Sequence, residues 1–267
     1  MVNESGSGFL YHLKNRPARW LRSILYKSPL GSLISTWRSD NYSSQEYWDD
    51  KLTGEFSSYL ADTTSIAVRN QIVVTLLRQF APNLESVLDL GCGNGSLNDL
   101  LDFNKPIRYT GVGISSVAIE SATHRASNQD SRRTTAFIVS SISDFTPRDG
   151  EHYDAIIFSE VLSYLSIPDA VNQIGRLQHN LSPHGIFIVS MKDHPKSHAI
   201  MKKISSAITP ITGILYQEIT GAPRYRIVFN RERPAYLTQV FKVVTEKADR
   251  SSKVAPTRRS DPFSTGK

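Results

Sequence analysis

The chain has 267 residues, a formal charge of +6 and a single cysteine, Cys92. This length accommodates one domain of about 200 residues with additional segments. One cysteine excludes an internal disulfide and gives no support to a cysteine-based metal site. No apolar run approaches the roughly 18 to 20 residues that a helix needs to span a bilayer, and the first residues lack the apolar core of a secretory signal. The sequence therefore predicts a cytoplasmic location.

The positive charge is concentrated at the two ends of the chain. Residues 1–40 and residues 247–267 each carry six basic and two acidic side chains, so the segment between them is close to neutral. Neither end interleaves basic with aromatic residues as RNA-binding modules do, and we expect no nucleic-acid partner. Residues 248–267 have few apolar side chains and are predicted to form a disordered basic tail.

The basic N-terminal extension, residues 1–43, contains one short amphipathic pattern. After Pro17, apolar side chains from Trp20 to Leu25 fall on one helical face among basic residues, and Ser28-Pro29 ends the pattern. The predicted helix fits two interpretations. Either it packs on the domain as an extension, or it attaches the protein to a membrane surface through residues 8–28.

A domain is predicted over residues 44–247, and it begins with a helical cap. Between residues 44 and 80 the apolar positions recur at helical spacing, which predicts two or three helices. The core sheet is expected to follow over residues 83–230.

The most informative segment runs from Val87 to Leu97. It is an apolar strand that leads into a turn where Gly91, Gly93 and Gly95 alternate, two residues after Asp89. Such a turn lets backbone amides approach a ligand more closely than any Cβ permits, and the next helix starts there. The spacing differs from the G-x-G-x-x-G of dinucleotide-binding folds. The turn therefore suits a nucleotide-like ligand that meets a nearby carboxylate.

Strand patterns alternate with helical patterns after Asn83, which predicts an α/β fold with a parallel sheet and crossover helices. The expected strands are Ser86–Leu90, Arg108–Ile114, Thr135–Val139, Tyr153–Phe158 and Gly185–Met191. The expected helices are Ser96–Asp102, a helix capped by Ser115 that ends at Arg125, Asp169–Leu181 and Ser197–Ala207. Leu215–Thr220 and Tyr225–Phe229 would form a terminal antiparallel pair.

Three of these segments together resemble a known family. The run from Asp89 to Gly95 is similar to the first motif of the class I S-adenosylmethionine-dependent methyltransferases. Phe158–Leu165 resembles the fourth motif of the small-molecule enzymes of types 11 and 12, especially the nodulation N-methyltransferase type, and Leu181–Gly185 resembles the turn before their fifth strand. The resemblance covers about residues 44–230. It implies a Rossmann-like, doubly wound, seven-stranded, mostly parallel sheet with a terminal antiparallel pair, preceded by N-terminal helices.

The same resemblance implies S-adenosyl-L-methionine as cofactor and methyl transfer to an oxygen or nitrogen of a small or lipid-like molecule. The Asn-Pro-Pro-Tyr type signature of enzymes that methylate DNA or protein amide nitrogen is absent, which favours a small-molecule acceptor. Tyr59 and Arg69 of the cap are candidates for cofactor contact. The alternative is that Tyr59 belongs to the hydrophobic core and that Arg69 lies on a solvated face. The residues implied to bind the cofactor are Asp89, Gly91, Gly93, Gly95, Ile114, Ser141, Ile142 and Ser159.

The chain departs from the family pattern at the ends of two strands. Relatives usually place an acid after the second strand for the ribose hydroxyls, where this chain has Gly113, and an Asp after the third strand for the adenine, where it has Ser141. An intact charge-assisted hydrogen bond contributes about 1.5–3 kcal/mol. The alternative interpretation is therefore a catalytically degenerate fold that acts as a binding, scaffold or membrane-associated protein.

Methyl transfer mainly requires the alignment of the two substrates, but a hydroxyl acceptor also benefits from a general base. The candidates are Tyr164, after the fourth strand, and His194, after the fifth, with Asp193 and His198 in the same region. Asp193 and His198 supply too few ligands for a metal ion, and we predict no metal site.

Overall fold

A computed structural model describes residues 44–53, 63–101, 105–127, 134–211, 215–218 and 235–243. The basic extension with the helix expected between residues 8 and 28, the basic tail and Tyr59 lie outside the described residues. Within the described ranges, no helix is long and apolar enough to cross a membrane.

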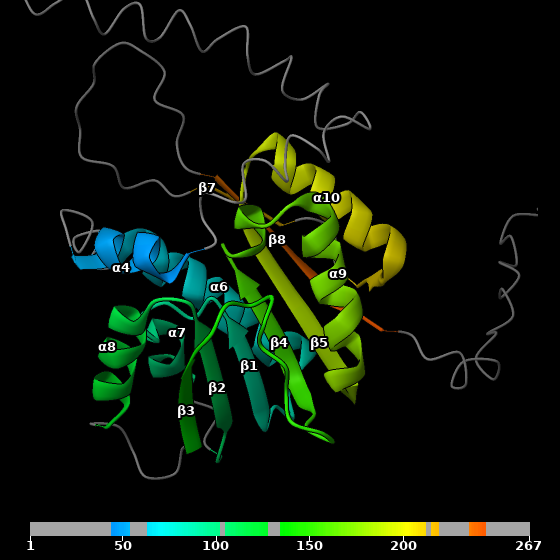
Figure 1. Ribbon diagram of the computed structural model, residues 1–267. Helices are drawn as coiled ribbons and strands as arrows, with labels where there is room; N and C mark the ends of the chain where they lie inside the picture. The colour runs from blue at the N-terminus through cyan, green and yellow to red at the C-terminus, as the bar shows by residue number, and fades with distance from the viewer. Residues whose placement is uncertain are drawn as a thin grey trace, which may run out of the picture.

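One mixed sheet organises the chain (Figure 1). Its five parallel strands are β1 (Ser86–Leu90), β2 (Arg108–Gly113), β3 (Thr134–Val139), β4 (Tyr153–Ser159) and β5 (Leu181–Lys192). They lie in the order β3-β2-β1-β4-β5, so the winding direction reverses between β1 and β4. Ligands of such doubly wound sheets bind beyond the carboxyl ends of the strands, near this reversal.

The sheet is completed by antiparallel strands at its far edge. β8 (Ala235–Lys242) lies antiparallel to β5, and both β6 (Thr209–Pro210) and β7 (Leu215–Glu218) pair with β8. Pro210 lies opposite Phe241 and Leu215 opposite Thr238, so β6 and β7 follow one another along the same edge of β8. Together they form the outermost row of the sheet. The predicted seven-stranded, mostly parallel Rossmann-like fold is confirmed.

The terminal antiparallel pair needs one correction. Its first strand begins at Leu215 as expected, but the partner is Ala235–Lys242 rather than Tyr225–Phe229, which lies outside the described residues. Thr238 and Gln239 give β8 a polar sequence, yet both side chains are buried. The Thr238 hydroxyl is paired with the Ser190 hydroxyl of β5 at 3.1 Å. This hydrogen bond makes a polar residue compatible with an interior strand.

Helices cover both faces of the sheet, and the strands are therefore apolar on both sides. On one face, α9 (Ile167–Leu177) and α10 (Pro195–Ala207) pack on alternate strand residues such as Ile156 and Phe158. On the other face, α6 (Thr63–Phe80) and the short α7 (Ser96–Asp99) pack on the intervening residues, Ala155 among them. Figure 1 shows α9 and α10 on the side of the sheet opposite α6.

The remaining helices lie around the ends of the strands. They are α8 (Ser116–Ser127) and α4 (Gln45–Thr53), with short 3-10 segments η2 (Leu162–Tyr164) and η3 (Gln178–Asn180). Helix α4, η2 and the start of α8 are near the carboxyl ends, whereas η3 directly precedes the amino end of β5. Ser115 caps α8 as predicted, because its hydroxyl accepts the backbone N–H of Ala118 at 3.2 Å. The helix expected at Asp169–Leu181 instead starts at Ile167 and stops at Leu177, because Ser166 provides the cap and Leu181 already belongs to β5.

Helix α4 is fastened to the start of α8 by one carboxylate. Asp49 accepts hydrogen bonds from the hydroxyls of Ser115, at 2.5 Å, and Ser116, at 2.9 Å. Although partial burial raises the pKa of Asp49, these hydrogen bonds have the opposite effect, and the net result is a pKa below its usual value. The contact holds α4, the first helix of the segment 44–80, beside the carboxyl end of β2, whereas α6 of the same segment packs on a face of the sheet.

Candidate functional site

The turn after β1 adopts a backbone that favours glycine. Gly91, Gly93 and Gly95 have φ values of 80°, 55° and 73°, in the left-handed region. The backbone N–H groups of Gly91 and Cys92 donate to the carbonyl oxygen of Val112 at 2.8 and 3.0 Å, which folds the turn back onto β2. A Cβ on Gly91 would lie 2.7 Å from the Cβ of Val161. The three-glycine pattern is therefore a steric requirement of the turn.

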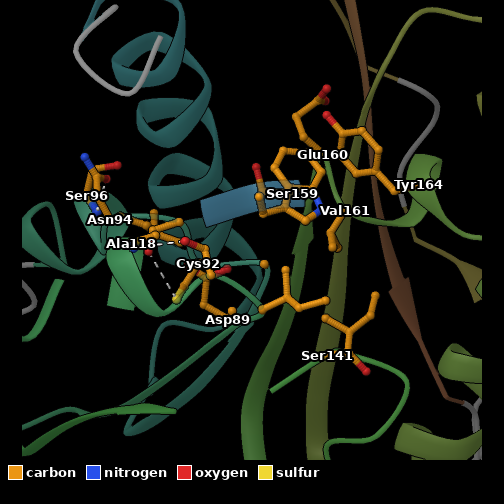
Figure 2. Close-up of a pocket in the computed structure, with 18 of the residues that line it drawn as sticks. Asp89, Cys92, Asn94, Ser96, Ala118, Ser141, Ser159, Glu160, Val161 and Tyr164 are labelled. Atoms are coloured by element: carbon orange, nitrogen blue, oxygen red, sulfur yellow. Dashed lines mark hydrogen bonds between the residues drawn. The ribbon is translucent and has the colours of Figure 1, made fainter. Parts of the chain in front are cut away.

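The turn forms one wall of a cavity of about 470 Å³ at the carboxyl ends of the strands (Figure 2). The cavity brings together seven of the eight residues expected to bind a cofactor, as well as Arg69 and Tyr164. The seven are Asp89, Gly91, Gly93, Ile114, Ser141, Ile142 and Ser159. Gly95 is not part of the lining. It precedes α7, where a Cβ would lie 2.8 Å from the ring of Phe137, so its position indicates a packing requirement.

Asp89 is the most deeply buried acid of the cavity. Its Oδ2 accepts a hydrogen bond from the Tyr109 hydroxyl at 2.6 Å, whereas its Oδ1 is buried and has no hydrogen-bond partner among the described residues. Burial raises the pKa of Asp89 to about 6, although the Tyr109 hydrogen bond and the nearby Arg69 guanidinium act in the opposite direction. A buried carboxylate oxygen without a partner is costly unless a ligand supplies one.

Glu160 lines the opposite side of the cavity and was not among the predicted site residues. Burial raises the pKa of its carboxyl to about 7, against the effect of Arg69 and Lys192. Its Oε1 is also buried without a hydrogen-bond partner in the described part of the chain. The sequence does contain one signal for this residue, since it is an acid directly after an apolar strand of a parallel sheet.

The end of β3 corrects one expectation about charge. Ser141 lines the cavity as predicted, but its hydroxyl donates to a carboxylate oxygen of Asp144 at 2.7 Å and accepts the Asp144 N–H at 3.1 Å. Asp144 also lines the cavity. The negative charge that appeared to be lost after β3 is therefore present three residues later. After β2, by contrast, Gly113 and Ile114 line the cavity without an acidic side chain.

Aromatic side chains from two distant segments cover the cavity beside Glu160. The rings of Trp48, on α4, and Tyr164, on η2, meet edge to face with centroids 4.9 Å apart. Leu52, Val161 and Leu165 extend this apolar wall. A wall of this kind reduces the access of water to polar groups beneath it and strengthens their electrostatic interactions.

The two predicted general-base candidates lie in different environments. Tyr164 lines the cavity, whereas His194 does not and instead caps α10, its Nδ1 accepting the backbone N–H of Lys196 at 3.2 Å. His198 pairs with Asp193 through its Nε2 at 2.7 Å, and neither residue lines the cavity. No group of three or more His, Cys, Asp or Glu side chains that could hold a metal ion occurs among the described residues.

Comparison with known proteins identifies relatives of this fold and motif. The profile of a family described as a methyltransferase domain matches residues 83–240. The chain is 28% identical over 123 residues to a trans-aconitate 2-methyltransferase of Paracidovorax citrulli, covering 45% of this chain and 44% of that protein. It is 31% identical over 143 residues to the corresponding protein of Escherichia fergusonii, covering 52% and 53%. The chain thus spans about half the length of the curated relatives it matches.

Among solved structures, the N-methyltransferase NodS from Bradyrhizobium japonicum WM9, in complex with S-adenosyl-L-homocysteine, superposes with a TM-score of 0.56. The superposition covers 74% of this chain and 97% of NodS at 17% sequence identity. At that identity the similarity establishes a shared fold.

Proposed function

The chain belongs to the methyltransferase-domain family, and on that premise we propose that it transfers a methyl group from S-adenosylmethionine to an oxygen or nitrogen of a small organic molecule. The matched family region, residues 83–240, includes the glycine turn and every strand that contributes to the cavity. The observation that carries the proposal is the unpartnered, buried Oδ1 of Asp89 beside that turn. It supplies a hydrogen-bond acceptor where a ligand with N–H or O–H donors would lie.

The residues that line the cavity fit this cofactor. The open backbone of Gly91 and Gly93 and the carboxylate of Asp89 would hold its polar amino-acid part. The side chains of Ile142 and Ser141, with Asp144 behind them, would receive the adenine. The apolar face of a purine is compatible with Ile142, and its amino group with a carboxylate or hydroxyl acceptor.

When bound, S-adenosylmethionine supplies an electrophilic methyl group on a sulfonium that is already a good leaving group. The chain itself then has to orient the methyl donor and the acceptor and to exclude water from between them. Asp89 and Glu160 place two carboxyl groups around one cavity, and in their ionised forms these groups stabilise positive charge on a ligand. Trp48 and Tyr164 cover the cavity and limit competition from solvent.

The name of the matched relatives raises a polycarboxylate as one candidate acceptor, because those proteins are trans-aconitate 2-methyltransferases. The fold-level relative NodS is an N-methyltransferase and raises an amine as another. A lipid-like acceptor and membrane attachment through residues 8–28 stay predictions from the sequence, as does a cytoplasmic location.

Titration calorimetry of the full chain with S-adenosylhomocysteine tests the proposal. We expect binding in the micromolar range, weakened at least tenfold by Asp89→Ala. Asp149→Asn is the matched control, since this acid is exposed and does not line the cavity. No binding at millimolar ligand, with the protein folded, would reject the enzymatic function and favour the degenerate binding or scaffold protein.

A further inference from the structure

The wall of the cavity beyond the glycine turn combines an acid with aromatic rings. Glu160, Val161 and Tyr164 come from the segment that follows β4, and Trp48 reaches the same wall from α4. Figure 2 shows Glu160 and Tyr164 across the pocket from Asn94 and Ser96, which belong to the glycine-turn side. Glu160, Trp48 and Tyr164 are not among the residues assigned to the cofactor, although Val161 between them lies against Gly91, and they are available to a second ligand.

The backbone holds Glu160 in an unusual conformation. Its φ is 64°, the one left-handed value found for a residue other than glycine in the described segments. Its backbone N–H donates to the carbonyl oxygen of Ser190 at 2.8 Å, and the backbone N–H of Lys192 hydrogen-bonds its carboxylate. A left-handed residue with a β-carbon costs of order 1 kcal/mol or more, and such strain clusters at functional sites. Glu160 is thus fixed with one carboxylate oxygen satisfied and Oε1 left for a ligand.

The charge of the cavity selects the sign of that ligand. Among the described lining residues the acids are Asp89, Asp144 and Glu160, whereas Arg69 is the one basic side chain. Arg69 already interacts electrostatically with both Asp89 and Glu160. A cationic acceptor would favour the ionised forms of Asp89 and Glu160 and would be attracted to them, whereas an anionic acceptor would find one basic lining side chain, Arg69, which already interacts with both acids.

We propose that the methyl acceptor is an amine on an apolar body, and that Glu160 Oε1 binds its amino group while Trp48 and Tyr164 enclose the adjoining carbon atoms. This inference rests on the proposed function and names the acceptor class for the same site. Aromatic faces favour ammonium and methylammonium groups through cation–π attraction, which adds to the carboxylate contact. The geometry meets both needs of an amine, one charged acceptor and an aromatic enclosure.

Glu160 can also receive the proton that an ammonium must lose before its nitrogen becomes a nucleophile. In this step the N–H bond breaks, an O–H bond forms at Oε1, and the nitrogen keeps the electron pair. The charged groups facing Glu160 are Arg69 of α6 and Lys192 of β5, both of which favour its ionised form. Burial opposes them and leaves the pKa near 7, within reach of proton transfer at neutral pH.

Calorimetry with paired probes tests the acceptor class. The full chain is titrated with hexylamine and with hexanoate, which share an apolar body and differ in charge, both with and without saturating S-adenosylhomocysteine. We expect hexylamine to bind at least tenfold more tightly than hexanoate. Hexylamine affinity should fall at least tenfold in Glu160→Gln and recover in part in Glu160→Asp, which restores the carboxylate. Glu120→Gln, an exposed site on α8 outside the lining, is the matched control and should bind as the unmodified chain does.

Thermal unfolding of each variant establishes that it is folded before binding is compared. Equal binding of both probes, preference for hexanoate, no amine binding, or unchanged hexylamine affinity in folded Glu160→Gln would each overturn the amine assignment. Loss of S-adenosylhomocysteine binding alone would reject the donor instead, because the amine titration without that ligand still reports on Glu160. The two failures are therefore distinguishable.

Discussion

Replacement of Gly91 by alanine separates the two reasons why the turn after β1 needs glycine. The first is backbone conformation, because its φ of 80° costs a residue with a β-carbon about 1–2 kcal/mol. The second is space, because the new Cβ would lie 2.7 Å from Cβ and 2.8 Å from Cγ2 of Val161. Overpacking of this kind costs about 1–3 kcal/mol. We expect Gly91→Ala to destabilise the chain by about 2–5 kcal/mol.

Gly150 provides the matched control for this prediction. Its φ is 73°, but no atom lies within 4 Å of the position that its Cβ would occupy. Gly150→Ala should therefore cost only the conformational part, about 1–2 kcal/mol. The difference between the two variants isolates the contact with Val161.

Denaturant unfolding measures both free energies, and calorimetry with S-adenosylhomocysteine measures the effect on the site. We expect Gly91→Ala to weaken binding at least tenfold, because relief of the contact moves either the turn or Val161, both of which line the cavity. Gly150→Ala should leave affinity unchanged. The double variant Gly91→Ala with Val161→Gly should lose less unfolding free energy than the sum of the losses in the two single variants. Equal destabilisation by the two alanines, or normal ligand affinity in Gly91→Ala, would refute the steric reasoning.

Three further predictions concern charge and capping. Because the folded-state pKa of Glu160, about 7, lies above its ordinary value of 4.5, the folded state binds more protons between these pH values. The free energy of unfolding should thus decrease as pH rises from about 4.5 to 7. In Glu160→Gln this decrease, measured by denaturant unfolding at each pH, should be smaller by up to about 3 kcal/mol. The Cβ of a residue that replaces Gly113 would have one tight contact, with Ile119 Cδ1 at 3.3 Å, and ordinary contacts at 3.7 Å with Cys92 Sγ and Ile119 Cγ1. Gly113→Asp should therefore be accommodated and should bind S-adenosylhomocysteine about tenfold more tightly by calorimetry, whereas Gly113→Asn, which lacks the charge, should gain less. Ser166→Ala removes the cap that accepts the Asp169 N–H at 3.2 Å and should cost about 1 kcal/mol in denaturant unfolding without altering ligand affinity; a change below 0.3 kcal/mol would contradict the capping role.

The sequence was sufficient to predict the parallel part of the sheet because each of those strands is locally distinct. The predicted bounds Ser86–Leu90 agree with those of β1, since Val87, Leu88 and Leu90 form a short apolar core that is followed directly by a glycine turn. Ala235–Lys242 was missed because Thr238 and Gln239 interrupt its apolar pattern. Its interior position depends on pairing with β5, where the hydroxyl of Ser190 is the partner of the Thr238 hydroxyl. A contact between residues so distant in sequence leaves no local signal.

The candidate site shows the same division. The spacing of the glycines predicts the conformation of the turn, and Gly91 and Gly93 line the cavity, whereas Gly95 does not. Glu160 was missed because nothing in its local sequence shows that one carboxylate oxygen is buried without a partner. His194 was selected for its proximity in sequence to β5, but its ring caps α10. A histidine directly before a proline, as in His194-Pro195, is compatible with a helix start, and this local signal indicates a capping role for His194.

The sequence of β2 alone does not show whether a carboxylate lies near the end of this strand, and helix α4 illustrates why. The segment ends at Gly113, yet a carboxylate does reach this corner of the sheet, because Asp49 of α4 binds the hydroxyl of Ser115. Trp48 and Leu52 lie one residue before and three residues after Asp49 on the same helix, and both line the cavity. Residues three or four apart share a helix face, so Leu52 lies beside both Asp49 and Trp48. The hydrogen bonds between Asp49 and the start of α8 fix the position of α4, and with it the two side chains that line the cavity. The carboxylate at this corner therefore acts on the cavity through the position of α4, while the lining at the end of β2 consists of Gly113, Ile114 and Ser115.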